Sequence, residues 1–500
     1  MSGAASALIR EGEAVSCHPW PRYILTLPIW DAMRGALAEE PGLVFQGLWA
    51  DTAQVHALFL APEPLIASVP VERGLYGALS PWRPGAALFE RMVTDLWGHR
   101  AAEALDPRPW LDHGRWPLLR PMSTRPVPNP AQPEPWEPLP AEGTGLNQIP
   151  VGPIHGIVTE PAHFRVTAEG EQVVRLEARL GYAHKGALLL MRGKSPRVAA
   201  KAAARVAGDS TVAHSVAFAR AVEAALGAEA PPRAASLRGI MAELERVASH
   251  LGTLGAILGA ASSAALAGAL AALREGVLRA SGAVFGHRLM MDVVVPGGVA
   301  GDLSAEGVAM LLAAIEQVAA AMPGIVRTYD RSPGLADRMG GTGIVPAQAL
   351  VAFAPGGIAG RAAGWTFDAR RALPYPPYGD LAFDVPVRGG GDVDARVRVR
   401  LAEVGESLGL LRALLGTLPG DPLLTTLPSG SGEGVGWAEG FRGDVWHWVR
   451  LDGGTVAVVF ARDPSWLHWP VLEAATAGAL VEDIPLIRES VGGSCSGVDL

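Results

Sequence analysis

The amino-acid sequence predicts an α+β protein. A small α/β N-terminal domain is followed by a large domain in which a β-hairpin or small sheet accompanies a central bundle of long helices. Three observations lead to this prediction. A proline-dense segment interrupts the first third of the chain, a stretch of alternating apolar and polar residues follows it, and five long helix-compatible runs then dominate.

The proline-dense segment covers residues 121–140 and contains eight prolines. Because proline fixes φ and removes an amide donor, this density favours an extended, semi-rigid linker. We therefore expect a domain at residues 1–120, a linker at 121–146 and a second domain at 147–500.

Local patterns assign elements to both parts. Before the linker, short apolar runs predict strands at 24–30 and 55–62, and residues 84–98 read as a helix. After it, alternation predicts a hairpin over 164–180 with a turn at Glu169–Gly170, and strands return over 437–460. Sparsely charged runs predict long buried helices at residues 196–226, 236–259, 264–285, 305–329 and 392–418.

Composition excludes several classes of protein. The net charge of −8 argues against nucleic-acid binding through a basic surface. Residues 251–273 carry no charge, but the glycines and serines within them favour two helices joined near residues 259–263 over one membrane span. The N-terminus lacks the basic-then-apolar order of an export signal, so we expect a cytoplasmic protein.

Cysteine is the most restrictive count. The chain has only two, Cys17 and Cys495. They are too few for a disulfide framework, for a four-thiolate zinc site or for an iron–sulfur cluster bound in the usual way. Phosphate-binding GxxxxGK loops, GxSxG elbows and HExxH pairs are also absent from the sequence.

An ordered series of segments carries a family resemblance. These segments are GPIHGIVTEPAHFRV, LGYAHKG, ARVAGDSTVAHSVAFARAVEAALG, LRGIMAELERVASHLGTLG and RAAGWTFDARRALPYPPY. In this order they resemble the large subunit of energy-converting nickel–iron hydrogenases and the related 49-kilodalton subunit of respiratory complex I. In the first 120 residues, FERMVTDLWGH is similar to the complex I 30-kilodalton subunit. Fusion of the two units is the arrangement of hydrogenase-4 and formate-hydrogenlyase large subunits, so the resemblance implies the hydrogenase large-subunit fold after the linker.

The sequence departs from this family where the family binds metal. Two CxxC pairs hold nickel and iron in the hydrogenases, whereas Ala207 and Ser210 stand at the first pair here. Cys495 is at most one of the second pair. Since alanine offers no donor and a serine hydroxyl is a hard ligand for a soft metal, we expect no metal in this chain. The complex I headgroup partners are also replaced, by Thr159 and Gly208.

Acid–base residues of the hydrogenase kind remain. The resemblance implies a proton-shuttling role for Glu160 and an overhanging position for Arg442, and Asp209 adds a carboxylate in the vacated segment. We name these three as a candidate proton relay. The alternative is that the carboxylates form structural ion pairs with Arg442, Arg361 or Arg205.

Three further residues are candidate substrate-binding groups: His155, His163 and Arg361. The carboxylate–arginine pattern of Asp368, Arg370 and Arg371 is instead interpreted as architectural.

The resemblance implies a subunit of a membrane-associated, complex I-like oxidoreductase. We expect an iron–sulfur cluster on a partner small subunit resembling the complex I 20-kilodalton subunit, and antiporter-like membrane subunits as further partners. A quinone or similar organic molecule would accept electrons, and the chain would lie peripherally on the cytoplasmic face of the cell membrane. NAD binding and NADH dehydrogenase activity are implied only for the whole complex. The alternative function is a non-redox scaffold or coupling subunit of an ion-translocating membrane complex.

Overall fold

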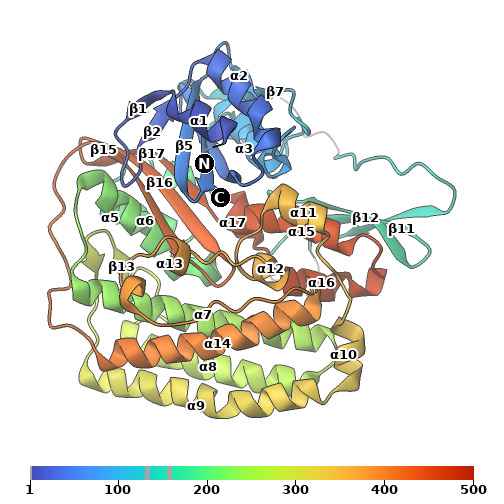
Figure 1. Cartoon of the computed structure of the whole chain (residues 1–500), viewed down its shortest axis with the longest axis vertical. Helices are drawn as coiled ribbons and strands as arrows, with labels where there is room; N and C mark the ends of the chain where they lie inside the picture. The colour runs from blue at the N-terminus through green and yellow to red at the C-terminus, as the bar shows by residue number, and fades with distance from the viewer. Residues whose placement is uncertain (1–2, 130–135, 155–159) are drawn as a thin grey trace.

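The computed structural model describes residues 3–129, 136–154 and 160–500. Figure 1 shows an N-terminal sheet with its helices above a second, C-terminal sheet, and a stack of long helices beneath them. Helices and strands both contribute to the architecture, in agreement with the predicted α+β class.

The N-terminal sheet has five strands in the order β1-β2-β5-β4-β3. Only the β2–β5 pair is parallel among its neighbours. The strands are β1 (Glu13–Val15), β2 (Arg22–Ile24), β3 (Val44–Ala50), β4 (Gln54–Ala61) and β5 (Glu63–Pro70), and the accompanying helices are α1 (Ala4–Arg10), α2 (Leu27–Ala36) and α3 (Ala87–Trp97).

The strand predicted over 24–30 is wrong for most of its length. Strand β2 ends at Ile24, and helix α2 begins at Leu27 with Pro28 in its first turn. Proline favours the first turn of a helix because its fixed φ is helical and its missing N–H has no partner there. The predicted strand at 55–62 and helix at 84–98 correspond to β4 and α3.

The C-terminal sheet consists of β15 (Gly432–Glu439), β16 (Asp444–Asp452) and β17 (Thr455–Arg462). Helix α6 (Thr211–Leu226) packs on it at unusually close range. A Cβ on Gly432, Gly434 or Gly436 would lie 2.1–2.2 Å from a backbone carbonyl of α6. Alternate glycines on the strand therefore allow α6 to approach the sheet backbone to backbone, which fixes the position of every side chain on that face of the helix.

Four long helices form the bundle beneath the sheet (Figure 1): α7 (Pro232–Ala260), α8 (Ala264–Phe285), α9 (Ala305–Asp330) and α14 (Val393–Gly416). Their bounds agree closely with the predicted runs. The charge-free stretch at 251–273 forms the end of α7 and the start of α8, with the break at 261–263, as predicted.

The run predicted as one helix over 196–226 is two. Helix α5 (Pro196–Ala203) ends before a short non-helical stretch, a 3₁₀ turn covers Gly208–Ser210, and α6 follows. Since Ala207 and Ser210 lie in this interruption, the vacated ligand segment forms a tight loop at the N-terminal end of α6.

The predicted hairpin is confirmed as β11 (His163–Glu169) and β12 (Gln172–Arg179), with β10 (Leu146–Val151) as a third strand. Its turn lies at Gly170 and Glu171, where Gly170 adopts positive φ. The chain ends in α15 (Ser465–Thr476), α16 (Ile484–Val491) and the short α17 (Cys495–Asp499).

Smaller elements complete the fold. They are strands β6 (Leu75–Gly77), β7 (Arg100–Ala102), β8 (Leu118–Leu119), β9 (Val127–Pro128), β13 (Val294–Val295) and β14 (Gly298–Val299), and helices α4 (Ala187–Met191), α10 (Pro333–Met339), α11 (Ala347–Phe353), α12 (Gly357–Ala362) and α13 (Ala369–Ala372).

The segments before and after the proline-rich stretch share one continuous apolar core. Trp49 of β3 stacks on Phe460 of β17 with ring centroids 5.0 Å apart. Arg22 of β2 pairs with both carboxylate oxygens of Glu433 on β15, each at 2.9 Å. The N-terminal sheet is therefore packed against the C-terminal sheet.

One helix in the described residues, Ala305–Asp330, is long and apolar enough to cross a membrane by length and composition, and a third of its most apolar window is buried.

Candidate functional site

The candidate site lies where the loop before α6, the β15–β16 turn and the C-terminal end of the chain meet. Arg442, in that turn, forms a bidentate ion pair with Asp209, with both N–O distances 2.6 Å. The same guanidinium donates to Ser210 Oγ at 3.1 Å and to the Gly492 carbonyl at 2.5 Å. Burial alone would lower the pKa of Arg442, but the Asp209 carboxylate raises it above its ordinary value.

The Glu160 side chain contacts the N-terminal end of α17, the last helix of the chain. Its carboxylate accepts the backbone N–H of Cys495 at 2.6 Å and that of Ser496 at 3.3 Å, and Ser494 Oγ donates to it at 3.2 Å. Electrostatic interactions also couple it to Arg442 and to Lys185. The structure thus brings the three candidate relay residues into one region, where Arg442 interacts electrostatically with both carboxylates.

We call the acidic groups of this region the carboxylate cluster. Its members are Glu160, Asp209, Asp463 and Asp499, and all four interact electrostatically with Lys185. The Lys185 ammonium donates to the carbonyls of Arg205 and Val206 at 2.6 and 2.8 Å, and burial lowers its pKa.

Asp499 is a fully buried member of the carboxylate cluster. It accepts the backbone N–H groups of Gly181 and Ala183 at 2.7 and 2.8 Å. Burial, together with the nearby Glu160 charge, raises the pKa of Asp499 to about 7 in spite of these two hydrogen bonds. A carboxyl group with a pKa near neutrality can exchange protons under ordinary conditions.

A buried Asp–His–His chain leads away from the cluster. Asp463 accepts from His214 Nε2 at 3.0 Å, and His214 Nδ1 lies 3.0 Å from His447 Nε2. All three side chains are fully buried. Burial lowers the pKa of His447 well below its ordinary value, whereas the hydrogen bond from His214 helps to hold the pKa of Asp463 low against the opposing effect of burial. This arrangement favours a neutral His447, and it joins α6 to the C-terminal sheet.

The vacated metal positions do not fit a nickel–iron centre. Ala207 is fully buried and offers no donor, and Ser210 Oγ already accepts a hydrogen bond from Arg442. Cys495 is the remaining sulfur, and burial raises the pKa of its thiol, which disfavours the thiolate that a metal needs. Among the described residues, no three His, Cys, Asp or Glu side chains are grouped to hold a metal ion.

Arg361 does not lie with the relay residues. It is completely buried and pairs with Glu403 at 2.7 Å and with Glu439 at 2.8 Å, inside a network that also contains Asp368 and Arg370. The alternative named Arg442, Arg361 or Arg205 as ion-pair partners of the site carboxylates, and the structure shows the first of these, the pairing of Asp209 with Arg442. Among the described residues, Arg205 pairs with Asp292 instead.

Of the two candidate substrate-binding histidines, the structure describes only His163. His155, like Thr159, falls outside the described residues. His163 begins β11, its Nδ1 lies 3.3 Å from the Gly152 carbonyl, and its ring meets the edge of Trp136. Burial lowers the pKa of His163. In the part of the chain that the structure describes, no hydrogen bond, ion pair or ring contact joins His163 to the carboxylate cluster.

Several residues of the site were not named as candidates from the sequence. Lys185 stood within a quoted motif, but Asp463, Asp499, His214 and His447 lie as much as 318 residues from the groups they contact. The sequence signal that could have found Asp463 is its position directly before Pro464, three residues after the strands predicted over 437–460.

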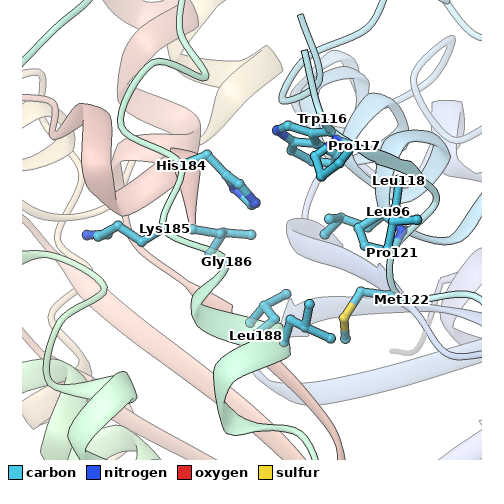
Figure 2. A pocket seen from close by; sticks show the side chains of 12 residues that line it. Leu96, Trp116, Pro117, Leu118, Pro121, Met122, His184, Lys185, Gly186 and Leu188 are labelled. Carbon is cyan, nitrogen blue, oxygen red and sulfur yellow. The ribbon is translucent and has the colours of Figure 1, made fainter. Parts of the chain in front are cut away.

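An apolar cavity of about 320 Å³ adjoins the cluster. Figure 2 shows Trp116, Leu96 and Met122 on one side of it and His184 to Leu188 on the other. His184 faces Trp116, with ring centroids 4.6 Å apart, while the Lys185 ammonium points away from the cavity. The backbone of residues 184–186 thus separates this cavity from the carboxylate cluster.

Two protein-family models match parts of this chain. Residues 259–431 match the family model described as respiratory-chain NADH dehydrogenase, 49 Kd subunit, and residues 185–253 match the model described as nickel-dependent hydrogenase.

Curated relatives match over most of their length. The carbon monoxide-induced hydrogenase of Rhodospirillum rubrum is 30% identical over 347 residues, which are 69% of this chain and 96% of that protein. Hydrogenase-4 component G of Escherichia coli is 30% identical, over 85% of this chain and 76% of that protein. NADH-quinone oxidoreductase subunit 4 of Thermus thermophilus is 31% identical, over 75% and 98%.

One solved structure shows the same fold. It is a chain of the membrane-bound sulfane sulfur reductase, an archaeal respiratory membrane complex, with a TM-score of 0.67 and 23% identity, and the match covers 73% of this chain and all of that one. The relatives are subunits of membrane-bound hydrogenases and of complex I-like respiratory complexes.

Proposed function

Because the chain belongs to the family that unites the large subunits of membrane-bound nickel–iron hydrogenases with the 49-kilodalton subunit of complex I, we propose that it is the large subunit of a membrane-associated oxidoreductase complex without a nickel–iron centre of its own. The observation that carries this proposal is the combination of an unsuitable donor set at Ala207 and Ser210 with a retained carboxylate cluster beside it.

In this proposal the redox cofactor belongs to a partner. An iron–sulfur cluster on a small subunit, similar to the complex I 20-kilodalton subunit, delivers electrons to an acceptor near the carboxylate cluster. Antiporter-like membrane subunits form the other partners, and the chain lies peripherally on the cytoplasmic face of the membrane. NADH, where it is the donor, is oxidised on another subunit.

The acceptor is a quinone or a similar small organic molecule. The apolar cavity beside residues 184–186 supports this choice, since its walls are predominantly apolar side chains and it lies one backbone segment away from the cluster. Reduction of a quinone to a quinol consumes two electrons and two protons. The electrons come from the cluster of the small subunit, and the carboxylate cluster supplies and replaces the protons.

The residues of this chain would act on protons and on charge. Asp499, with its pKa near 7, is protonated about half of the time at neutral pH, and Lys185 stabilises the negative charge left after the proton departs. Glu160, hydrogen-bonded at the start of the C-terminal helix, is the carboxylate that connects this helix to the Arg442–Asp209 pair.

The test uses the intact complex, purified from the membrane with its native partners. We expect reduction of a short-chain quinone by the reduced complex, and a rate about 100-fold slower or more in Glu160→Gln, the range of general acid–base contributions. The control Glu489→Gln, which alters the partly exposed ion pair of Glu489 with Arg488, should retain the rate. Absence of acceptor reduction together with absence of an iron–sulfur signal would reject the proposal.

A scaffold role is the second candidate, and one observation favours it. Asp209 is already neutralised by Arg442, so this part of the site serves as a structural ion pair in the resting state. If the co-purified small subunit lacks cluster-binding cysteines, the scaffold role replaces the redox role.

A further inference from the structure

A second cavity, separate from the carboxylate cluster, lies between α6, the start of α7 and β15. Its volume is about 300 Å³. Small apolar residues and prolines make up much of its wall, among them Pro19, Val216, Ala224, Ala235 and Pro376. A cavity of this size accommodates a small organic molecule.

Arg220 supplies an unpaired charge to this cavity. In the described part of the chain, no hydrogen bond or ion pair engages its guanidinium, and its Nε is buried without a hydrogen-bond partner. Buried or half-buried arginines usually have an anionic partner, since desolvation of the charge is costly. Burial accordingly lowers the pKa of Arg220 to about 10.

The nearest carboxylate is already occupied. Glu223 accepts two hydrogen bonds from Arg238, at 2.6 and 3.1 Å, and a third from the backbone N–H of Gly297 at 2.8 Å. Arg238 is in turn satisfied by Glu223 and by the carbonyls of Val295 and Gly298. The exposed Glu229 also lines the cavity, but it makes no ion pair with Arg220. Arg220 is thus left as the free cation of this cavity among the residues described.

Two aromatic rings hold the guanidinium in place. Its central carbon lies 4.3 Å from the ring centre of Trp437 and 4.6 Å from that of Tyr375. The rings are themselves fixed, because Trp437 Nε1 donates to the Leu373 carbonyl and the Glu439 N–H donates to the Tyr375 hydroxyl. Cation–π contacts offset part of the desolvation, and they leave the hydrogen-bonding edge of the guanidinium without a partner.

We propose that this cavity is a binding site for a small organic carboxylate, whose two oxygens pair with the Arg220 guanidinium and whose apolar body contacts the small residues of the wall. A planar, rigidly held guanidinium matches a carboxylate in bidentate geometry, and the low-polarity surroundings strengthen the pair. The inference is independent of the redox proposal, since it uses none of the groups in the carboxylate cluster.

The probe is benzoate, with neutral benzamide as its isostere. We expect benzoate, but not benzamide or an equal concentration of chloride, to raise the melting temperature of the full chain in a saturable way. Arg220→Leu should weaken benzoate binding about tenfold or more, the range for a hydrogen-bonded charge. Arg197→Leu, which changes an exposed arginine on α5, is the matched control and should bind as the parent does.

A second variant keeps the test informative if Arg220→Leu does not fold. Ala224→Leu fills the cavity without changing any charge, and it should also abolish the benzoate effect. The proposal is overturned if benzoate has no saturable effect on the parent chain, or if Arg220→Leu and Ala224→Leu both respond as the parent does. Binding to the isolated chain but not to the intact complex would assign the site to an acidic side chain of a partner and would also overturn it.

Discussion

Arg442 and Asp209 form a bidentate ion pair, with both N–O distances 2.6 Å, at the loop before α6 that contains Ala207 and Ser210. The Arg442 side chain is 11% exposed and that of Asp209 is 46% exposed. The energetic contribution of the pair is therefore limited by solvent screening of its exposed partner.

The first prediction concerns this pair. Asp209→Asn should cost less than about 1 kcal/mol of unfolding free energy, because a half-exposed ion pair is screened by water. It should nevertheless slow acceptor reduction by the intact complex, since the charge beside Glu160 is altered. Denaturant unfolding and steady-state rates measure the two effects.

Asp292→Asn is the matched control for this variant. It removes the partner of Arg205 in another bidentate surface pair, with N–O distances of 2.7 and 2.8 Å, and should leave the rate unchanged. Equal rate losses in both variants would contradict the assignment of Asp209 to the site.

The second prediction is a pH dependence set by Asp499. In the unfolded chain this carboxyl ionises near 3.8, whereas in the folded chain its pKa is about 7. Between these values the folded state binds more protons, so stability falls as pH rises from about 4 to 7, with a slope of up to about 1.4 kcal/mol per pH unit.

Asp499→Asn should remove this slope, although the loss of one backbone hydrogen bond lowers stability at every pH by a constant amount. Unfolding free energies measured from pH 4 to 8 give the comparison. An unchanged slope in the variant would show that Asp499 is ionised in the folded protein, in the presence of the neighbouring Glu160 and Lys185.

The third prediction concerns the buried histidine chain. Asp463→Ala leaves His214 Nε2 and the Ser465 N–H without their acceptor, and we expect a loss of about 3 kcal/mol or more. Asp337→Ala, at an exposed position of α10, should change stability by less than about 0.5 kcal/mol. Similar small losses of unfolding free energy in both variants would show that the hydrogen bonds of Asp463, His214 and His447 do not stabilise the fold.

The fourth prediction tests the close approach of α6 to the sheet. A methyl group at position 434 would lie 2.2 Å from the Ala221 carbonyl and 2.5 Å from the Ala225 nitrogen, so Gly434→Ala should cost about 2–3 kcal/mol. Gly405→Ala, on an open face of α14, should be neutral or stabilising by about 0.5–1 kcal/mol. Thermal unfolding of both variants separates steric collision from a general effect of replacing glycine.

Much of the fold follows from local pattern. The helices at 264–285 and 305–329 and the hairpin near 164–180 were predictable because apolar periodicity and turn residues are local signals. The pattern failed at 24–30, where Pro28 starts a helix inside an apolar run, and at 204–210, where a loop interrupts a continuous helical pattern. At both places the backbone conformation decides the structure, and the pattern of apolar and polar residues does not reveal it.

The candidate site was predictable only in part, for a different reason. The Arg442–Asp209 pair was one of the alternatives open from the sequence, since the family resemblance placed both residues near the vacated metal position. The contacts of Lys185, Asp463 and Asp499 depend on the tertiary packing of the chain terminus against the loop before α6. The same holds for Arg220, whose lack of a partner is visible only once Glu223 is seen to pair with Arg238.

The most direct test of the central claim is electron paramagnetic resonance of the intact, reduced complex, frozen before and after addition of a short-chain quinone. We predict an iron–sulfur signal from the small subunit that disappears on addition of the quinone, with no nickel signal in either state. A nickel signal, or an iron–sulfur signal that the quinone leaves unchanged, would contradict the account.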